Sequence, residues 1–77
     1  MTEQILDARG LLCPLPVLKI RKRLRAMGEG DELAVIADDP AAIVDIPHFC
    51  NEAGHVLVSM EDAGPSQTYI IRKSLPG

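Results

Sequence analysis

The order in which helical and extended hydrophobic patterns alternate is the feature that most constrains the fold of this chain. Residues 32–37 (Glu-Leu-Ala-Val-Ile-Ala) form a nearly continuous apolar run between turn-forming residues, which is typical of a central strand of a sheet. The flanking segments, residues 14–27 and 40–53, instead repeat apolar residues at steps of three and four, which predicts amphipathic helices. A strand enclosed by two helices indicates an α/β domain.

The first predicted helix begins at Pro14 and ends at Gly28. Its inward stripe is expected to consist of Val17, Ile20, Leu24 and Met27. Basic residues fill most of the other positions of its later turns, where positive charge interacts favourably with the negative end of the helix dipole. The basic residues therefore have a structural explanation that needs no ligand.

The second predicted helix begins with Asp39 as N-cap and Pro40 at the first helical position, and Gly54 ends it. Its inward stripe is expected to consist of Ile43, Ile46, Cys50 and Ala53. Pro47 lies inside this segment and cannot donate a hydrogen bond to the carbonyl of residue 43. We therefore expect a kink at Pro47, or a first turn separated from the rest of the helix.

Three further strands are predicted at residues 4–8, 55–61 and 67–73, the last two joined by a turn over residues 62–66. A chain of 77 residues supports one domain with a thin core, so the expected domain covers residues 1–77. The predicted fold is an α/β two-layer sandwich of order βαβαββ, in which a mixed four-stranded sheet carries both helices on one face.

The two cysteines have different expected environments. Cys50 falls on the apolar stripe of the second helix and is expected in the core, whereas Cys13 lies outside any stripe, at the junction of a loop and a helix. The N-terminal segment lacks the pattern of a signal peptide and no apolar run is long enough to span a membrane, so we expect a cytoplasmic protein with free thiols rather than a disulfide.

Other sites are less well supported by the sequence. Cys13, His48, Cys50 and His55 lack the paired spacing of a structural zinc site, and no metal or cofactor is expected. His48 is expected to face solvent and His55 to open a strand. An acid–base pair of Asp38 and Asp39 is an alternative to the capping role of Asp39.

Cys13 is the strongest candidate for a reactive residue. Gly10 precedes it in the loop, and Pro14 and Pro16 are expected to stiffen the first helical turn that presents it. The positive end of the helix dipole would lower the thiol pKa by less than one unit, and Arg9 would add a nearby cation. The sequence thus predicts an exposed, rigidly presented and mildly activated thiol.

A dense basic cluster distinguishes the first helix. Five of the eight basic residues of the chain lie within seven positions: Lys19, Arg21, Lys22, Arg23 and Arg25. The net charge of −3 and the scarcity of aromatic residues argue against direct nucleic-acid binding. We expect the cluster either to be a solvated helix face or to bind the acidic surface of a partner.

The run from Asp7 to Pro16, Asp-Ala-Arg-Gly-Leu-Leu-Cys-Pro-Leu-Pro, resembles the signature of the TusA-like (TusA/SirA-type) sulfur carriers. The resemblance extends to Arg21-Lys22, to Asp38-Asp39-Pro40, to the segment from Asp45 to Cys50, and to the ending Ile70-Ile71-Arg72-Lys73. It implies the same βαβαββ fold and a persulfide carried on Cys13, with Gly10, Pro14 and Pro16 as supporting residues and Arg9 as a variable position.

The resemblance also implies protein partners: a cysteine desulfurase or another sulfurtransferase as donor, and a downstream sulfur acceptor. The relay could serve 2-thiouridine synthesis in transfer RNA, molybdenum cofactor supply or sulfur oxidation. We expect a monomer without a membrane partner. Two alternatives stay open, a regulatory or adaptor domain that binds through the basic helix, and a thiol–disulfide redox protein, which the absence of a Cys-x-x-Cys pair disfavours.

Overall fold

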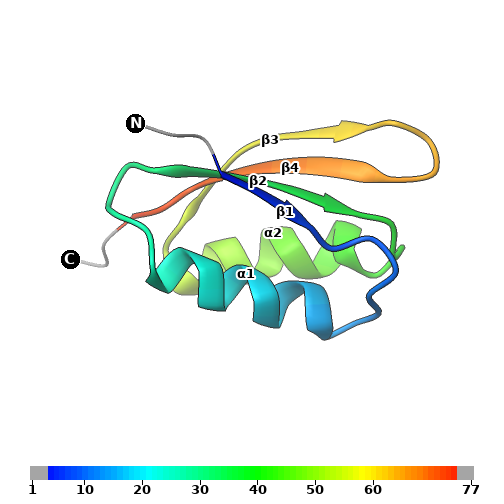
Figure 1. The fold of residues 1–77 in the computed structure, drawn as a ribbon, viewed down its shortest axis with the longest axis horizontal. Helices are drawn as coiled ribbons and strands as arrows, with labels where there is room; N and C mark the ends of the chain where they lie inside the picture. The colour runs from blue at the N-terminus through cyan, green and yellow to red at the C-terminus, as the bar shows by residue number, and fades with distance from the viewer. Residues whose placement is uncertain (1–3, 75–77) are drawn as a thin grey trace.

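A computed structural model of the protein describes residues 4–74, and its elements follow the predicted order (Figure 1). They are β1 (Gln4–Asp7), α1 (Leu15–Arg25), β2 (Glu32–Ala37), α2 (Ala42–Ala53), β3 (Val56–Asp62) and β4 (Gln67–Arg72). Residues 1–3 and 75–77 of the expected domain lie outside the described residues. Within residues 4–74, no helix has the length and apolar character needed to cross a membrane.

The four strands form one mixed sheet in the order β1-β2-β4-β3. β1 pairs with β2 in parallel, and β4 runs antiparallel to both of its neighbours, β2 and β3. Both helices cover the same face of this sheet (Figure 1). The predicted two-layer βαβαββ sandwich is therefore confirmed.

The core lies between the sheet and the two helices. The central strands contribute alternate residues that are fully inaccessible to solvent: Leu33, Val35, Tyr69 and Ile71. The helices contribute the apolar residues opposite them: Ile20, Leu24 and Ile46. The centre of the sheet is formed by β2 and β4, so the run at residues 32–37 is the central strand that its apolar character predicts.

Helix α1 begins one residue later than predicted. Pro14 is its N-cap, and Pro16 occupies the second helical position and is buried. Of the predicted stripe, Ile20 and Leu24 are buried within the helix, Met27 is buried just beyond its end, and Val17 is half-buried. The stripe is confirmed because three of its residues belong to the hydrophobic core and Val17 packs against that core.

Helix α2 begins at Ala42, two residues later than predicted, because Asp39 and Pro40 belong to a tight turn that precedes it. The backbone carbonyl of Asp39 accepts a hydrogen bond from the amide of Ala42 at 2.9 Å, and its side-chain Oδ1 accepts one from the amide of Ala41 at 3.1 Å. The carboxylate of Asp39 thus satisfies a free amide near the helix start without being the N-cap itself.

Pro47 lies inside one uninterrupted helix, so of the two outcomes expected there a separated first turn is excluded and a kink stays a prediction. Another expectation for α2 is wrong. Ile43 is 41% exposed, since the buried face is formed by Ala42, Ile46, Phe49 and Cys50. This stripe repeats at steps of four and three from Ala42, which places Ile43 beside the contact face rather than on it.

Candidate functional site

The loop that carries Cys13 is fastened to the end of β2 by two consecutive carboxylates. Asp39 Oδ2 accepts a hydrogen bond from the Cys13 amide at 2.7 Å, and Asp38 Oδ1 accepts one from the Gly10 amide at 3.0 Å. Gly10 has a φ of +82°, a left-handed conformation that glycine adopts without the penalty of a side chain. The acid–base pair considered from the sequence is therefore a clamp on the cysteine loop.

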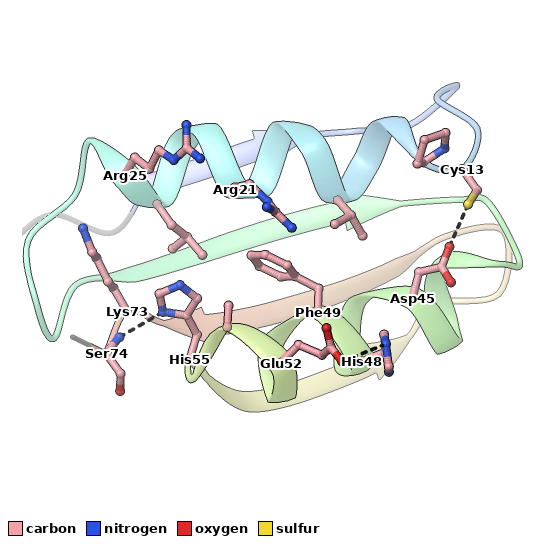
Figure 2. A pocket seen from close by; sticks show the side chains of 14 residues that line it. Cys13, Arg21, Arg25, Asp45, His48, Phe49, Glu52, His55, Lys73 and Ser74 are labelled. Atoms are coloured by element: carbon pink, nitrogen blue, oxygen red, sulfur yellow. Dashed lines mark hydrogen bonds and ion pairs between the residues drawn. The ribbon is translucent and has the colours of Figure 1, made fainter. Parts of the chain in front are cut away.

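Cys13 is exposed, and its sulfur lies 2.9 Å from Oδ2 of Asp45 in the first turn of α2 (Figure 2). The thiol donates this hydrogen bond, because a carboxylate can only accept. The hydrogen bond to Asp45 is the largest cause of a raised Cys13 pKa, and partial desolvation and the charges of Asp45 and Asp39 act in the same direction. Asp45 was not identified as a site residue from the sequence, since the contact joins segments 32 residues apart.

The expected mild activation of Cys13 is therefore wrong. The helix dipole favours a thiolate only weakly, whereas two carboxylates close to the sulfur oppose one. The amide of Leu15, in the first turn of α1, donates to the carbonyl of Leu12 at 2.8 Å. The cysteine is presented as predicted, at a helix start, but in an environment that keeps it protonated.

Arg9 does not provide the expected cation beside Cys13. Its guanidinium is bound to Asp7 through Nε and Nη2, both at 2.9 Å from the carboxylate oxygens. This pair holds the pKa of Asp7 at about 2, below the ordinary value of 3.8. The charge of Arg9 is thus engaged two residues away, at the end of β1.

Pro14 and Pro16 lie on either side of Leu15, the first residue of α1. The peptide bond between Cys13 and Pro14 is cis. Pro14 contributes to the wall of the groove next to the cysteine, while Pro16 is buried. The two prolines therefore have different surroundings, although the motif places them only two residues apart.

A groove of about 800 Å³ runs between α1 and α2, and Cys13 and Asp45 lie at one end of it (Figure 2). Apolar side chains line its length: Val17, Leu24, Phe49 and Ala53. The other end is formed by the last turn of α1 and by residues that follow β4. The groove was not predicted from the sequence, because its two walls are distant along the chain.

The basic cluster of α1 is divided between different surroundings. Arg21 and Arg25 line the groove, and the guanidinium of Arg21 lies 5.4 Å from the centre of the Phe49 ring. Arg23 instead lies against β1, where it donates to the backbone carbonyl of Ile5 at 3.4 Å. Lys19 and Lys22 are exposed and do not line the groove. Of the five basic residues, Arg21 and Arg25 line the groove and the other three do not.

His55 lies at the groove end opposite Cys13. Its Nδ1 accepts a hydrogen bond from the amide of Ser74 at 3.1 Å, and burial together with the charge of Lys73 lowers its pKa. The neutral imidazole is thus the favoured form there. His48 is exposed as expected and lies 3.7 Å from Glu52 on the rim of α2.

Cys50 is only 2% exposed and is packed in the core, which confirms its expected position. Burial raises the pKa of its thiol to about 11. Both cysteines are free thiols in the structure. A chemical role for a surface cysteine can therefore fall only on Cys13.

Two comparisons with known proteins agree with this architecture. The family model described as Sulfurtransferase TusA matches residues 4–73. The chain is also similar to the solved structure of a SirA-like protein from Desulfitobacterium hafniense, with 23% identity and a TM-score of 0.80, over 96% of this chain and 100% of that one. The match to that structure supports the fold, and the family match covers nearly the whole described chain. The chain therefore belongs to the TusA sulfurtransferase family, whose general role is that of a sulfur carrier.

Proposed function

We propose that this protein carries sulfane sulfur as a persulfide on Cys13. The donor is a cysteine desulfurase or another sulfurtransferase, and the sulfur passes to a downstream acceptor protein. The observation that carries the proposal is the exposure of Cys13 at one end of a groove, while the other cysteine is buried. We further propose a monomeric, single-domain cytoplasmic protein that acts without a cofactor and without binding nucleic acid or membrane directly.

The proposed loading step is an exchange without net oxidation. The sulfur of Cys13 loses its proton and attacks the outer sulfur of the donor's persulfide. A new sulfur–sulfur bond forms on Cys13 as the bond in the donor breaks, and the donor leaves as a thiol after taking up a proton. Delivery repeats the exchange, with a thiol of the acceptor as the attacking group.

Arg21 and Arg25 are the proposed contacts for an acidic surface of a partner. Their side chains lie along the groove that leads to Cys13, so a partner bound to them would have access to the sulfur. Substitution of either residue by glutamate should weaken donor binding, and salt should weaken the binding of the wild-type protein. Lys22→Glu is the matched control, because Lys22 is exposed on the same helix but does not line the groove.

The acceptor defines the pathway, and three are compatible with the family: thiolation of the wobble uridine of transfer RNA, sulfur supply for molybdenum cofactor, and sulfur oxidation. In each of them the chemistry required of Cys13 is the same. An acceptor would be identified by capture on the loaded protein in comparison with the unloaded protein. A regulatory adaptor role, the alternative, requires no sulfur on Cys13.

The test is loading by a cysteine desulfurase in the presence of cysteine, followed by intact mass measurement. The wild-type protein and Cys50→Ala should each gain one sulfur atom that a reductant removes, and Cys13→Ser should gain none. Absence of loading in the wild-type protein, or loading of Cys13→Ser, would contradict the proposal. Loss of loading in Cys50→Ala with the fold retained would also contradict it, because Cys50 would then take part in the transfer.

A further inference from the structure

Negative charge dominates the surroundings of Cys13. Asp45 reaches the sulfur from α2, and Asp39 binds the Cys13 amide from the turn that follows β2. On the α1 side the first charged residue that lines the groove is Arg21, two helical turns beyond Cys13. On the α2 side His48 lies 3.7 Å from Glu52, so its charge, when it is protonated, is shared with that carboxylate. Among these groups, the sulfur has its direct contact with Asp45.

We propose that Asp45 is a positioning residue that holds the unloaded sulfur of Cys13 as a hydrogen-bonded thiol, and that this contact breaks when sulfur is loaded. The release of this contact on loading rests on the proposed carrier function, whereas the hydrogen bond itself can be tested on protein that carries no sulfur. The 2.9 Å separation between the Cys13 sulfur and the Asp45 oxygen requires a proton between the two atoms. A free thiolate at that position would face a carboxylate without any donor.

Loading removes the basis of this contact. A persulfide is more acidic than a thiol and is largely an anion at neutral pH, so it has no proton to donate to Asp45. Like charges this close repel, and the outer sulfur is displaced away from Asp45 and Asp39. When the acceptor takes the outer sulfur, the electron pair of the broken bond stays on Cys13, which takes up a proton and restores the hydrogen bond to Asp45. The contact therefore stabilises the unloaded carrier and favours delivery of the sulfur.

The experiment measures the alkylation of unloaded Cys13 by iodoacetamide across pH 6 to 10, with no sulfur donor present. The modified Cys13 peptide is quantified by mass spectrometry, so that Cys50 does not contribute. Asp45→Asn removes the charge and keeps the shape, and Asp45→Ala also removes the acceptor. Glu52→Gln is the matched control, because Glu52 is a carboxylate of the same helix and groove without a contact to Cys13.

Both Asp45 variants should shift the rise in alkylation to lower pH, with a faster reaction at pH 7. A fall of one unit in a thiol pKa raises the thiolate population about tenfold but reduces its intrinsic nucleophilicity about threefold. Because the gain in thiolate population outweighs the loss of nucleophilicity, we expect Asp45→Asn to react faster than the wild-type protein at pH 7, and Glu52→Gln to keep the wild-type profile.

The inference is overturned if both folded Asp45 variants keep the wild-type profile, or if Glu52→Gln shifts it equally. Circular dichroism of each variant verifies the fold, and the isosteric Asp45→Asn provides the result if Asp45→Ala does not fold. Because the alkylation is measured on unloaded protein, its outcome is independent of whether Cys13 accepts sulfur from a desulfurase. Failure of the carrier proposal and failure of this inference are therefore distinguishable.

Discussion

Removal of the Asp39 carboxylate should destabilise the whole domain as well as the cysteine loop. This side chain is 8% exposed and accepts hydrogen bonds from two backbone amides, that of Cys13 at 2.7 Å and that of Ala41 at 3.1 Å. It thereby joins the loop before α1 to the turn before α2. Asp39→Ala deletes both hydrogen bonds in one change.

The magnitude follows from the number and type of these hydrogen bonds. A hydrogen bond to a charged group contributes about 1.5–3 kcal/mol, and the lower value applies here because water can reach the exposed Cys13 loop once the carboxylate is gone. Two such bonds give a loss of about 3 kcal/mol. A domain of 77 residues has a free energy of unfolding of only about 4–12 kcal/mol, so the loss is a large part of the total.

Urea unfolding followed by circular dichroism measures this change. The matched control is Asp38→Ala, which removes one hydrogen bond, from Gly10, at an exposed position and should lower the free energy of unfolding by about 1.5 kcal/mol or less. A loss below about 1 kcal/mol for Asp39→Ala would refute the reasoning. An equal loss in the two variants would refute it as well, since the Asp39 carboxylate would then contribute no more to the free energy of unfolding than the exposed Asp38 carboxylate.

Three further changes have defined outcomes. Arg9→Ala should return the pKa of Asp7 from about 2 towards 3.8 in an NMR titration. Because this pKa is lower in the folded state, the ion pair stabilises the protein fully above about pH 4 and less as the pH falls towards 2. An unchanged Asp7 pKa in the variant would contradict the ion pair. Gly54 has a φ of +83° at the end of α2, and Gly54→Ala would place a residue with a side chain in this left-handed conformation. The strain should lower the free energy of unfolding by about 1–2 kcal/mol. A thermal unfolding midpoint within about 2 °C of wild type would contradict this expectation. Cys50 is 2% exposed and has a pKa of about 11, so in native protein at pH 8 it should be alkylated much more slowly than Cys13. In concentrated urea the two cysteines should be alkylated at similar rates. Rapid labelling of Cys50 in native protein would show that the core opens.

The fold was predictable from the sequence because local pattern and tertiary role coincide in most elements. Ile20 and Leu24 repeat at helical spacing and are buried, and the apolar run at 32–37 is the central strand. The error at Ile43 has a physical reason. Apolar residues occupy both sides of the helix there, so periodicity alone does not determine whether Ala42 or Ile43 faces the sheet.

The candidate site was predictable only in part. Cys13 and Gly10 are found in a continuous motif, and their exposure and loop position follow from their neighbours in the chain. Asp45 is not recognisable in this way, because an acidic residue in the first turn of a helix is already explained by the helix dipole. The direction of the Cys13 pKa shift depends on that contact, so local reasoning gave the wrong sign.

The basic cluster illustrates the same limit. Five cations close together in a helix suggest one surface, but successive residues of a helix point in directions about 100° apart. Arg21 lies along the groove, whereas Arg23 lies against β1. Their separation could have been anticipated from helical geometry, but which of them borders the groove depends on the position of α2.

The clamp on the cysteine loop also determines how far the sulfur can travel. The amide of Cys13 is bound to Asp39, and the side chain beyond it is one of the shortest that can carry a sulfur atom. A sulfur atom carried on Cys13, as proposed, would therefore have no swinging arm, and its reach from the protein surface would be limited to rotation about one or two bonds. Its transport over longer distances would depend on diffusion of the whole protein, and its transfer would require a donor or acceptor segment that extends to the groove.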